Sequence, residues 1–132
     1  MRLIINVNDE NEKEKSNEEI TIDCRPIDHV RVFDEACYGW ERNHEYNLRF
    51  IRCQQQYAND ILNKKGFIFL NEVYTMFGLP PSKAGQIVGW IKGEGKFVDF
   101  GLESKLNERF MNGDINTAVL EFNVDGEILS KL

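Results

Sequence analysis

The stretch from Gly66 to Gly101, GFIFLNEVYTMFGLPPSKAGQIVGWIKGEGKFVDFG, limits the possible folds of this chain more than any other part. It opens with an apolar run and continues with an amphipathic pattern that predicts a helix over 70–78. Gly78 suits the left-handed conformation in which helices often end, and Pro80 and Pro81 cannot continue a helix. The chain must therefore change direction here.

Two apolar runs follow, over 86–92 and 96–101, and Gly-Glu-Gly separates them. Apolar runs joined by a Gly-rich tripeptide are typical of a β-hairpin. A third strand is predicted over 117–124, where apolar and polar residues alternate with a period of two. These three segments predict a central antiparallel sheet.

The region upstream of Gly66 predicts helices. Over 46–65 the apolar residues have helical spacing, Asn43 can cap the start, and Gly66 can end the helix after two lysines. Asn71 is the predicted cap of the next helix. The region 27–45 fits either a strand or a helix, and a helix is favoured because four residues fall at i, i+3, i+4 and i+7: Phe33, Ala36, Cys37 and Trp40.

The N-terminal residues 1–26 predict a hairpin, with strands over 2–7 and 20–24 on either side of an acidic loop, 8–19. Residues 27–132 would supply the helical and sheet core. A chain of 132 residues with 42% apolar residues can bury enough surface for one core. We therefore predict a single α+β domain, in which an antiparallel sheet of three to five strands packs against two or three helices.

The net charge of −6 is concentrated near the N-terminus. Residues 1–35 hold ten acids and five bases, whereas residues 36–132 hold twelve acids and eleven bases. Clustered Lys and Arg, which phosphate backbones require, are missing, so direct DNA binding is not expected. An acidic surface is suited to a basic protein surface, including one that itself binds nucleic acid.

Three cysteines, Cys24, Cys37 and Cys53, cannot all pair with one another, and none of their spacings is that of a zinc motif. We expect reduced thiols in a cytoplasmic protein. The opening run MRLIINV is too short for a signal peptide or a membrane span, so the protein is expected to be soluble.

Two candidate chemical sites have weak support. Cys37 and His44 could pair as a thiol and its base, or join Cys24 and His29 around a metal, but buried structural roles are commoner for such residues and the spacings match no zinc pattern. Four acids could instead converge on a divalent cation: Asp99, Asp114, Glu121 and Asp125. The tripeptide Asp99-Phe100-Gly101 also occurs in protein kinases, but the chain is too short for a kinase and lacks its other motifs. No cofactor or metal is expected.

The segment 70–91 has the outline of a helix-turn-helix. Its second helix would carry few cations and two helix-weakening glycines, Gly85 and Gly89, which argues against a DNA-reading role. Its aromatic residues Tyr74, Phe77 and Trp90 predict core positions, with an exposed patch for a protein partner as the alternative, in which Trp90 would be an anchor.

Several strings together resemble a family of small proteins with a domain of unknown function, encoded by phages and integrative elements of Gram-positive bacteria. The resemblance covers about 57–128 and rests on these strings: YANDIL (57–62), GFIFLNEVYTMFGLP (66–80), GQIVGW (85–90), FVDFG (97–101), FMNG (110–113) and LEFNVDGEI (120–128). It implies no catalytic residue. By analogy, it implies a protein that blocks a host defence factor, as anti-CRISPR proteins do.

We therefore expect a non-enzymatic protein that binds a host protein with a basic surface. The most specific candidate for this partner is a CRISPR effector nuclease. The protein could also form a homodimer. The predicted partner-binding residues are Glu10, Glu12, Glu14, Glu18, Glu19, Trp40 and Trp90. One alternative is a structural or assembly protein of a phage or conjugative element. Another is a small metal-dependent enzyme built on Asp99 and Asp125.

Overall fold

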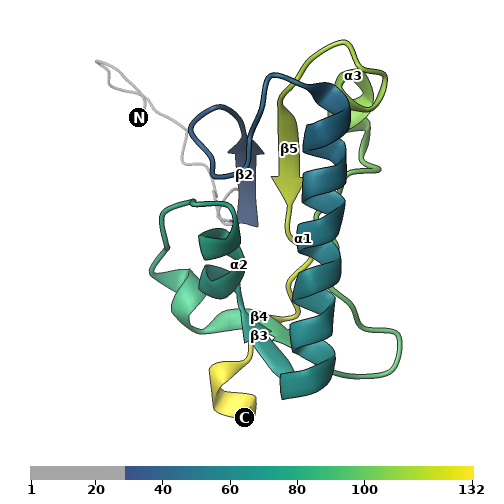
Figure 1. Ribbon diagram of the computed structural model, residues 1–132. Coiled ribbons are helices and arrows are strands. Elements are labelled where there is room, and N and C mark those ends of the chain that lie inside the picture. Colours follow the sequence, from purple (N-terminus) through teal and green to yellow (C-terminus); the bar gives the residue numbers. More distant parts are fainter. Residues whose placement is uncertain (1–28) are drawn as a thin grey trace, which may run out of the picture.

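A computed structural model of the chain describes residues 29–132, which form a long helix on one side and short strands and helices on the other (Figure 1). Within this described range the α-helices are α1 (His44–Lys65), α2 (Leu70–Met76) and α3 (Glu108–Met111). The strands are β2 (Val30–Phe33), β3 (Phe67–Phe69), β4 (Val88–Ile91), β5 (Ala118–Glu121) and β6 (Gly126–Glu127). Short 3₁₀ turns cover Ala84–Gln86, Lys105–Asn107 and Leu129–Lys131.

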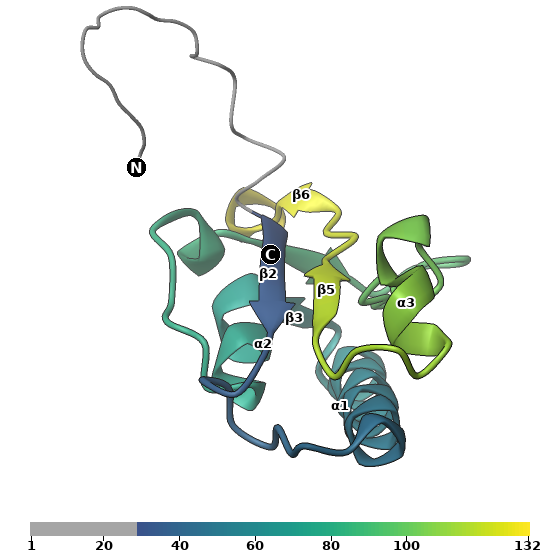
Figure 2. The ribbon, with the colours of Figure 1, turned by 90° about the horizontal axis from the view of Figure 1, so that it is seen from above.

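The strands form two small antiparallel sheets. β2 pairs with β5, with Phe33 opposite Ala118, and the two strands lie side by side in Figure 2. In the second sheet β4 is central, with β3 on one edge and β6 on the other. The predicted α+β class and the antiparallel arrangement of the strands are confirmed. The predicted single central sheet does not form, because β5, within the predicted strand 117–124, pairs with β2 and not with β4, within the predicted strand 86–92. The predicted hairpin of residues 1–26, with its acidic loop 8–19, lies outside the described residues.

An aromatic core joins these elements. The rings of Phe33, Phe77, Phe100 and Phe122 meet edge to face in sequence, with centroids 5.3 to 5.7 Å apart, and Tyr74 contacts Phe122 at 5.4 Å. All five residues are buried. Because they come from β2, from α2 and the residue after it, from the segment around Phe100 and from the residue after β5, these rings join the β2–β5 sheet, α2 and that segment in one core.

The caps of α1 agree with the sequence. The Asn43 side chain accepts a hydrogen bond from the Tyr46 N–H at 2.9 Å. Gly66 has a φ of +92° and donates its N–H to the Leu62 carbonyl at 2.8 Å. The predicted cap of α2 is wrong, because this helix begins at Leu70. Asn71 lies inside the helix, and its side chain instead accepts a hydrogen bond from the Ser82 N–H and donates one to the Ser82 carbonyl.

The prediction of a helix within 27–45 is also wrong. Its described part, from residue 29 on, forms β2 and then a series of turns up to α1. The Asp34 carboxylate accepts a hydrogen bond from the Ala36 N–H at 3.0 Å, a local bond that competes with helix formation. Gly39 has a φ of +87°, which a helix cannot contain.

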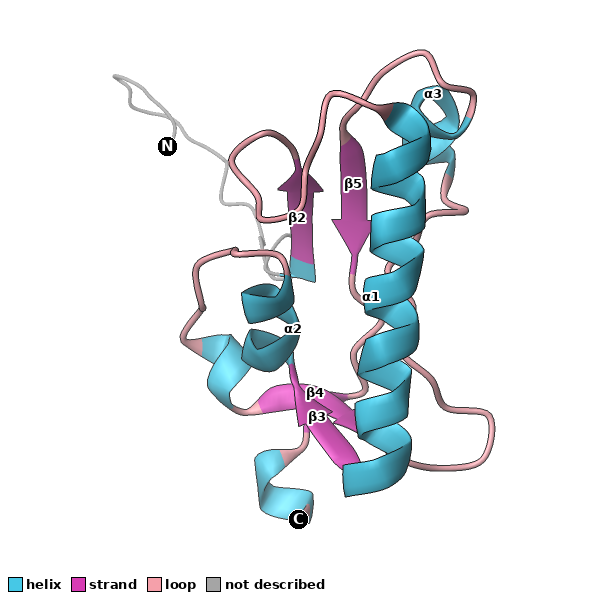
Figure 3. Cartoon of the chain, in the orientation of Figure 1, coloured by secondary structure: helices cyan, strands magenta, loops and turns pink. Residues whose placement is uncertain are grey.

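The predicted strand 96–101 is not a strand, and its hairpin with 86–92 does not form. Figure 3 shows loop from the end of β4 to the turn at Lys105–Asn107. A strand has two edges, and β3 and β6 already occupy both edges of β4. Residues 97–101 instead run between α1 and residues 121–123, where side chains from both sides hold the backbone.

None of the helices in residues 29–132 has the length and hydropathy that crossing a membrane requires.

Candidate functional site

The two tryptophans predicted as partner anchors are placed differently. Trp90 has no exposed surface, and its indole N–H donates to the Asn123 side chain at 2.9 Å. It belongs to the core and is out of reach of a partner in this conformation. Trp40 is half-buried, its indole N–H donates to the Asn116 carbonyl at 2.9 Å, and Arg42 lies over its ring at 5.9 Å. The five predicted acids, Glu10, Glu12, Glu14, Glu18 and Glu19, lie outside the described residues.

The Cys37 thiol has the opposite properties to those of an activated nucleophile. It is buried, and its Sγ lies 3.5 Å from the Val32 carbonyl oxygen. Burial raises the pKa of this thiol, which disfavours the reactive thiolate. His44, its predicted base, packs its ring edge-on against Phe110, with centroids 5.2 Å apart. Both contacts are those of structural residues.

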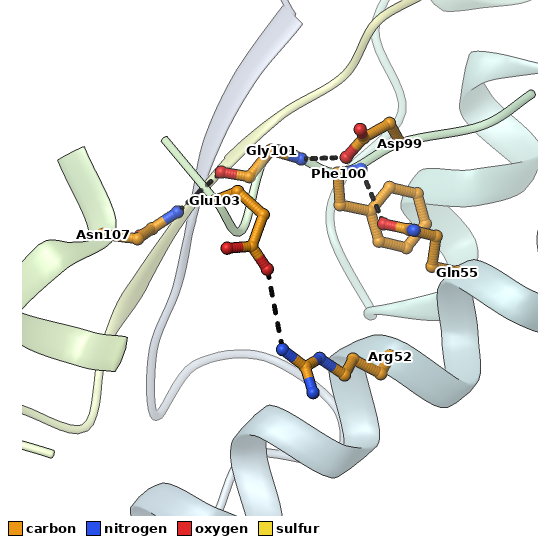
Figure 4. A network of polar contacts seen from close by, with 7 residues as sticks. All are labelled: Arg52, Gln55, Asp99, Phe100, Gly101, Glu103 and Asn107. Carbon is orange, nitrogen blue, oxygen red and sulfur yellow. Dashed lines mark hydrogen bonds and ion pairs between the residues drawn. The ribbon is translucent and has the colours of Figure 1, made fainter. Parts of the chain in front are cut away.

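Two of the acids predicted to bind a cation accept hydrogen bonds from backbone N–H groups instead. Asp99 accepts a hydrogen bond from the Gly101 N–H at 2.8 Å (Figure 4), and Asp125 accepts one from the Ile91 N–H at 2.8 Å. Lys96 lies 3.8 Å from the same Asp125 oxygen. In the part of the chain that the structure describes, no three His, Cys, Asp or Glu side chains are grouped to hold a metal ion.

A different surface stands out, on the outer side of α1. Its residues fall on the side of the helix opposite the buried Ile51 and Ala58, at spacings of three and four. We call this surface the α1 face, and it consists of Tyr46, Arg49, Arg52, Cys53, Gln56 and Tyr57. All six are exposed, with Tyr46 at 40% and Tyr57 at 55% of their full surface.

An aromatic stack forms one flank of the α1 face. The half-buried Phe50 ring lies between Tyr38 and Tyr46, with centroid distances of 6.0 and 6.3 Å. Tyr38 is 68% exposed, and it is fixed by a 2.8 Å hydrogen bond from its N–H to the Phe77 carbonyl. Gly39 follows it, and a side chain there would collide with the Phe50 ring. The backbone of Tyr38 is therefore fixed, and its ring and that of Tyr46 rest against Phe50.

Shallow hollows lie on both sides of the ridge formed by Arg49 and Cys53. The smaller hollow has a volume of about 170 Å³ and is lined by Tyr46 and Phe50 together with the ridge. The larger one has a volume of about 490 Å³, and its lining among the described residues is Glu45, Leu48, Arg49, Arg52, Cys53 and Gln56. The α1 face is thus contoured, with apolar floors beside charged groups.

The two arginines of the α1 face are weakly engaged. Arg52 lies 3.6 Å from the Glu103 carboxylate (Figure 4), with side chains 55% and 82% exposed. Such an exposed ion pair contributes little, because water and salt screen it. Within residues 29–132, neither an ion pair nor a hydrogen bond involves the Arg49 side chain. Both guanidinium groups are available to a partner.

The backbone behind the α1 face is fixed by amide side chains. Gln55 accepts a hydrogen bond from the Phe100 N–H at 2.9 Å, as Figure 4 shows, and Asn59 holds Val98. Asn107 donates to the Gly101 carbonyl at 3.0 Å and to the Val119 carbonyl at 2.8 Å. The segment that carries Glu103 is therefore anchored to α1 and to β5.

The sequence contained a signal for this surface. Tyr46 and Tyr57 occupy outward positions of the predicted helix 46–65, where polar and charged residues are usual, and Arg49 and Arg52 lie on the same side. The acidic residues and tryptophans predicted as anchors lie outside this surface.

Comparison with known protein families matches residues 5–132 to a family of unknown function, DUF6353. No curated protein and no solved structure matches the chain. A domain of unknown function is thus confirmed, over a longer range than the strings at 57–128, while an origin in phages or integrative elements stays a prediction. Because the match covers nearly the whole sequence, the chain belongs to the DUF6353 family.

Proposed function

We propose that this protein acts by binding another protein, not by catalysis, and that the α1 face is a contact surface. The observation that supports this is the exposure of two tyrosines and two arginines on one face of one helix. Tyr, Trp and Arg dominate the binding energy of protein interfaces, since they combine large apolar area with directed polar groups. Exposed tyrosines are the unusual part of this set, because solvent-facing helix positions ordinarily hold charged or small polar residues.

The rigidity of α1 also supports an interaction role. The helix has 22 residues, is capped at both ends and buries four residues on its inner side: Asn47, Ile51, Ala58 and Leu62. Gln54 donates to the Met76 carbonyl at 2.8 Å, which fixes α1 to the end of α2. A surface that is already ordered loses little conformational entropy on binding, so more of the contact energy remains as affinity.

Affinity capture with matched variants tests this proposal. The wild-type protein is expected to capture a partner from extracts of its source cell that the Tyr46→Ala/Tyr57→Ala variant does not. Leu106→Ala/Leu129→Ala is the control, because these side chains are 61% and 52% exposed but lie outside α1. Capture of the same proteins by the tyrosine variant and the wild type would rule out the α1 face.

A sharper form of the proposal is an inhibitor of a host defence nuclease, with anti-CRISPR activity as its most specific version. The support is the sequence: five glutamates at Glu10, Glu12, Glu14, Glu18 and Glu19, and the resemblance described above. Steering by such charges should weaken as salt rises. Changing all five to Gln should abolish capture of a CRISPR effector, and equal recovery by both proteins would end the charge-based mechanism.

A further inference from the structure

We propose that the α1 face recognises an acidic peptide segment, whose carboxylates pair with Arg49 and Arg52 and whose apolar side chain enters the hollow beside Phe50. The inference rests on the proposed function and names the chemistry of the partner. It concerns a different surface from the acidic N-terminal tract.

The arginines set the charge of the ligand. Arg49 and Arg52 are three residues apart on α1, so their side chains are neighbours about 5–6 Å apart at Cβ. Carboxylates spaced by one helical turn match this separation. A guanidinium group binds a carboxylate through two parallel hydrogen bonds, which an amide or a hydroxyl cannot reproduce. Glu103 can leave Arg52 at little cost, since the pair is 3.6 Å long and exposed.

The hollow sets the apolar part of the ligand. Its volume of about 170 Å³ is suited to one aliphatic or aromatic side chain. Two of its lining residues, Tyr46 and Phe50, have nearly parallel rings, at 14°, so one side of the hollow is an aromatic surface. Because Arg49 also lines this hollow, one short segment can place an apolar side chain and a carboxylate together.

Two other occupants fit the charges less well. A second copy of this chain, packed α1 against α1 about a two-fold axis at the ridge, would bring four guanidinium groups together. A nucleic acid strand would place a continuous row of phosphates across the α1 face, where Glu45 and Glu103 stand at the edge and repel it. A peptide can place its carboxylates only where the arginines are.

Selection from a random peptide display library against the full-length protein tests the inference. Wild type is expected to enrich peptides that carry at least two Asp or Glu residues near a large apolar residue. The Arg49→Ala/Arg52→Ala variant is expected to lose this enrichment. Lys83→Ala/Lys131→Ala is the control, because it removes two exposed cations far along the chain from α1 and should enrich the same peptides.

Synthetic copies of the enriched peptides then give the magnitudes by fluorescence anisotropy. Removing both arginines should weaken binding by roughly tenfold or more, as should changing the peptide acids to amides. Binding should also weaken as salt rises. An Arg49→Glu/Arg52→Glu variant should reject the acidic peptide and bind its Lys-substituted copy, which a merely damaged fold would not do.

Other outcomes overturn the inference. Enriched peptides that are neutral or basic, or no enrichment at all, would contradict it. So would a dimer that forms through α1, detected by light scattering, or binding of a labelled U20 or dT20 oligonucleotide that is tighter than binding of the peptide.

If Tyr46→Ala/Tyr57→Ala abolishes partner capture but the arginine variants do not, the acidic ligand is wrong and the interaction function stands. If neither set changes capture, the proposed function itself fails.

Discussion

Asn59 on α1 and Val98 are joined by two hydrogen bonds of 2.7 and 3.0 Å, so that one side-chain amide takes the place of a neighbouring strand. One turn earlier on α1, Gln55 accepts the Phe100 N–H. On the other side, the Glu121 N–H donates to the Phe100 carbonyl at 2.9 Å. Residues 97–101 are thereby held as an extended segment between a helix and the end of β5.

Replacing Asn59 by Ala should destabilise the protein by about 1–3 kcal/mol. Val98 is fully buried, so the variant leaves an N–H and a carbonyl without partners and away from water. Urea unfolding followed by circular dichroism measures the free energy change.

Asn63→Ala is the matched control for this change, because Asn63 is an exposed Asn one turn further along α1. Both substitutions gain the same helix propensity, so their difference isolates the bonds to Val98. Equal unfolding free energies for the two variants would show that the Asn59 amide does not stabilise residues 97–101.

Replacing Gly39 by Ala should destabilise the protein and displace the Phe50 ring. Gly39 has a φ of +87°, which costs an alanine about 1–2 kcal/mol, and the new Cβ would meet the ring atoms of Phe50. The cost of the substitution should therefore fall in a Phe50→Ala background, and a double-mutant cycle measures this coupling.

Gly66→Ala separates backbone strain from collision in that experiment. Gly66 has a φ of +92°, and no atom lies within 4 Å of its added Cβ. The substitution at Gly66 should cost only the strain, and less than that at Gly39. If Gly39→Ala and Gly66→Ala lower the unfolding free energy equally, and Phe50→Ala changes neither cost, then the close approach of Phe50 to Gly39 does not matter for stability.

Local signals made α1 predictable from sequence. Its caps, Asn43 and Gly66, act within one turn of the helix end, and its buried residues recur at helical spacing. The turn at Gly78 and the strand β5 were recognisable for the same reason. Each depends on neighbours in sequence and not on distant partners.

Long-range partners decided the elements that sequence alone missed. The alternation of Val98 and Phe100 correctly indicated extended backbone, but its partners are amides of α1 about 40 residues earlier, as the separations of 39 and 45 residues show. Trp90 is buried because β4 lies between β3 and β6, a pairing that its own segment does not encode. The α1 face, in contrast, follows from the sequence alone, because the spacing of the predicted helix 46–65 places its residues on one side.

Titration with MgCl₂ or MnCl₂ in a calorimeter is expected to give no binding heat. Asp99 and Asp125, on which a metal-dependent enzyme would be built, accept hydrogen bonds from backbone N–H groups, and Lys96 faces Asp125. A cation would have to displace these partners. Saturable heat that disappears in an Asp125→Asn variant would instead support the metal-dependent alternative.

Stability should fall at alkaline pH because of Cys37. Burial raises the pKa of this thiol in the folded state above its value in the unfolded chain. Below the unfolded pKa, near 8.5, both states hold the proton and the thiol adds no pH dependence. As pH rises above that value, the unfolded state loses the proton while the folded state keeps it, so unfolding becomes more favourable.

Urea unfolding at pH 7 to 10 with a reductant measures this effect. The difference in unfolding free energy between wild type and Cys37→Ala should shrink as pH rises. Ile51→Val, a core change without a titrating group, should keep a constant offset, and a constant offset for Cys37→Ala as well would contradict the role given to burial.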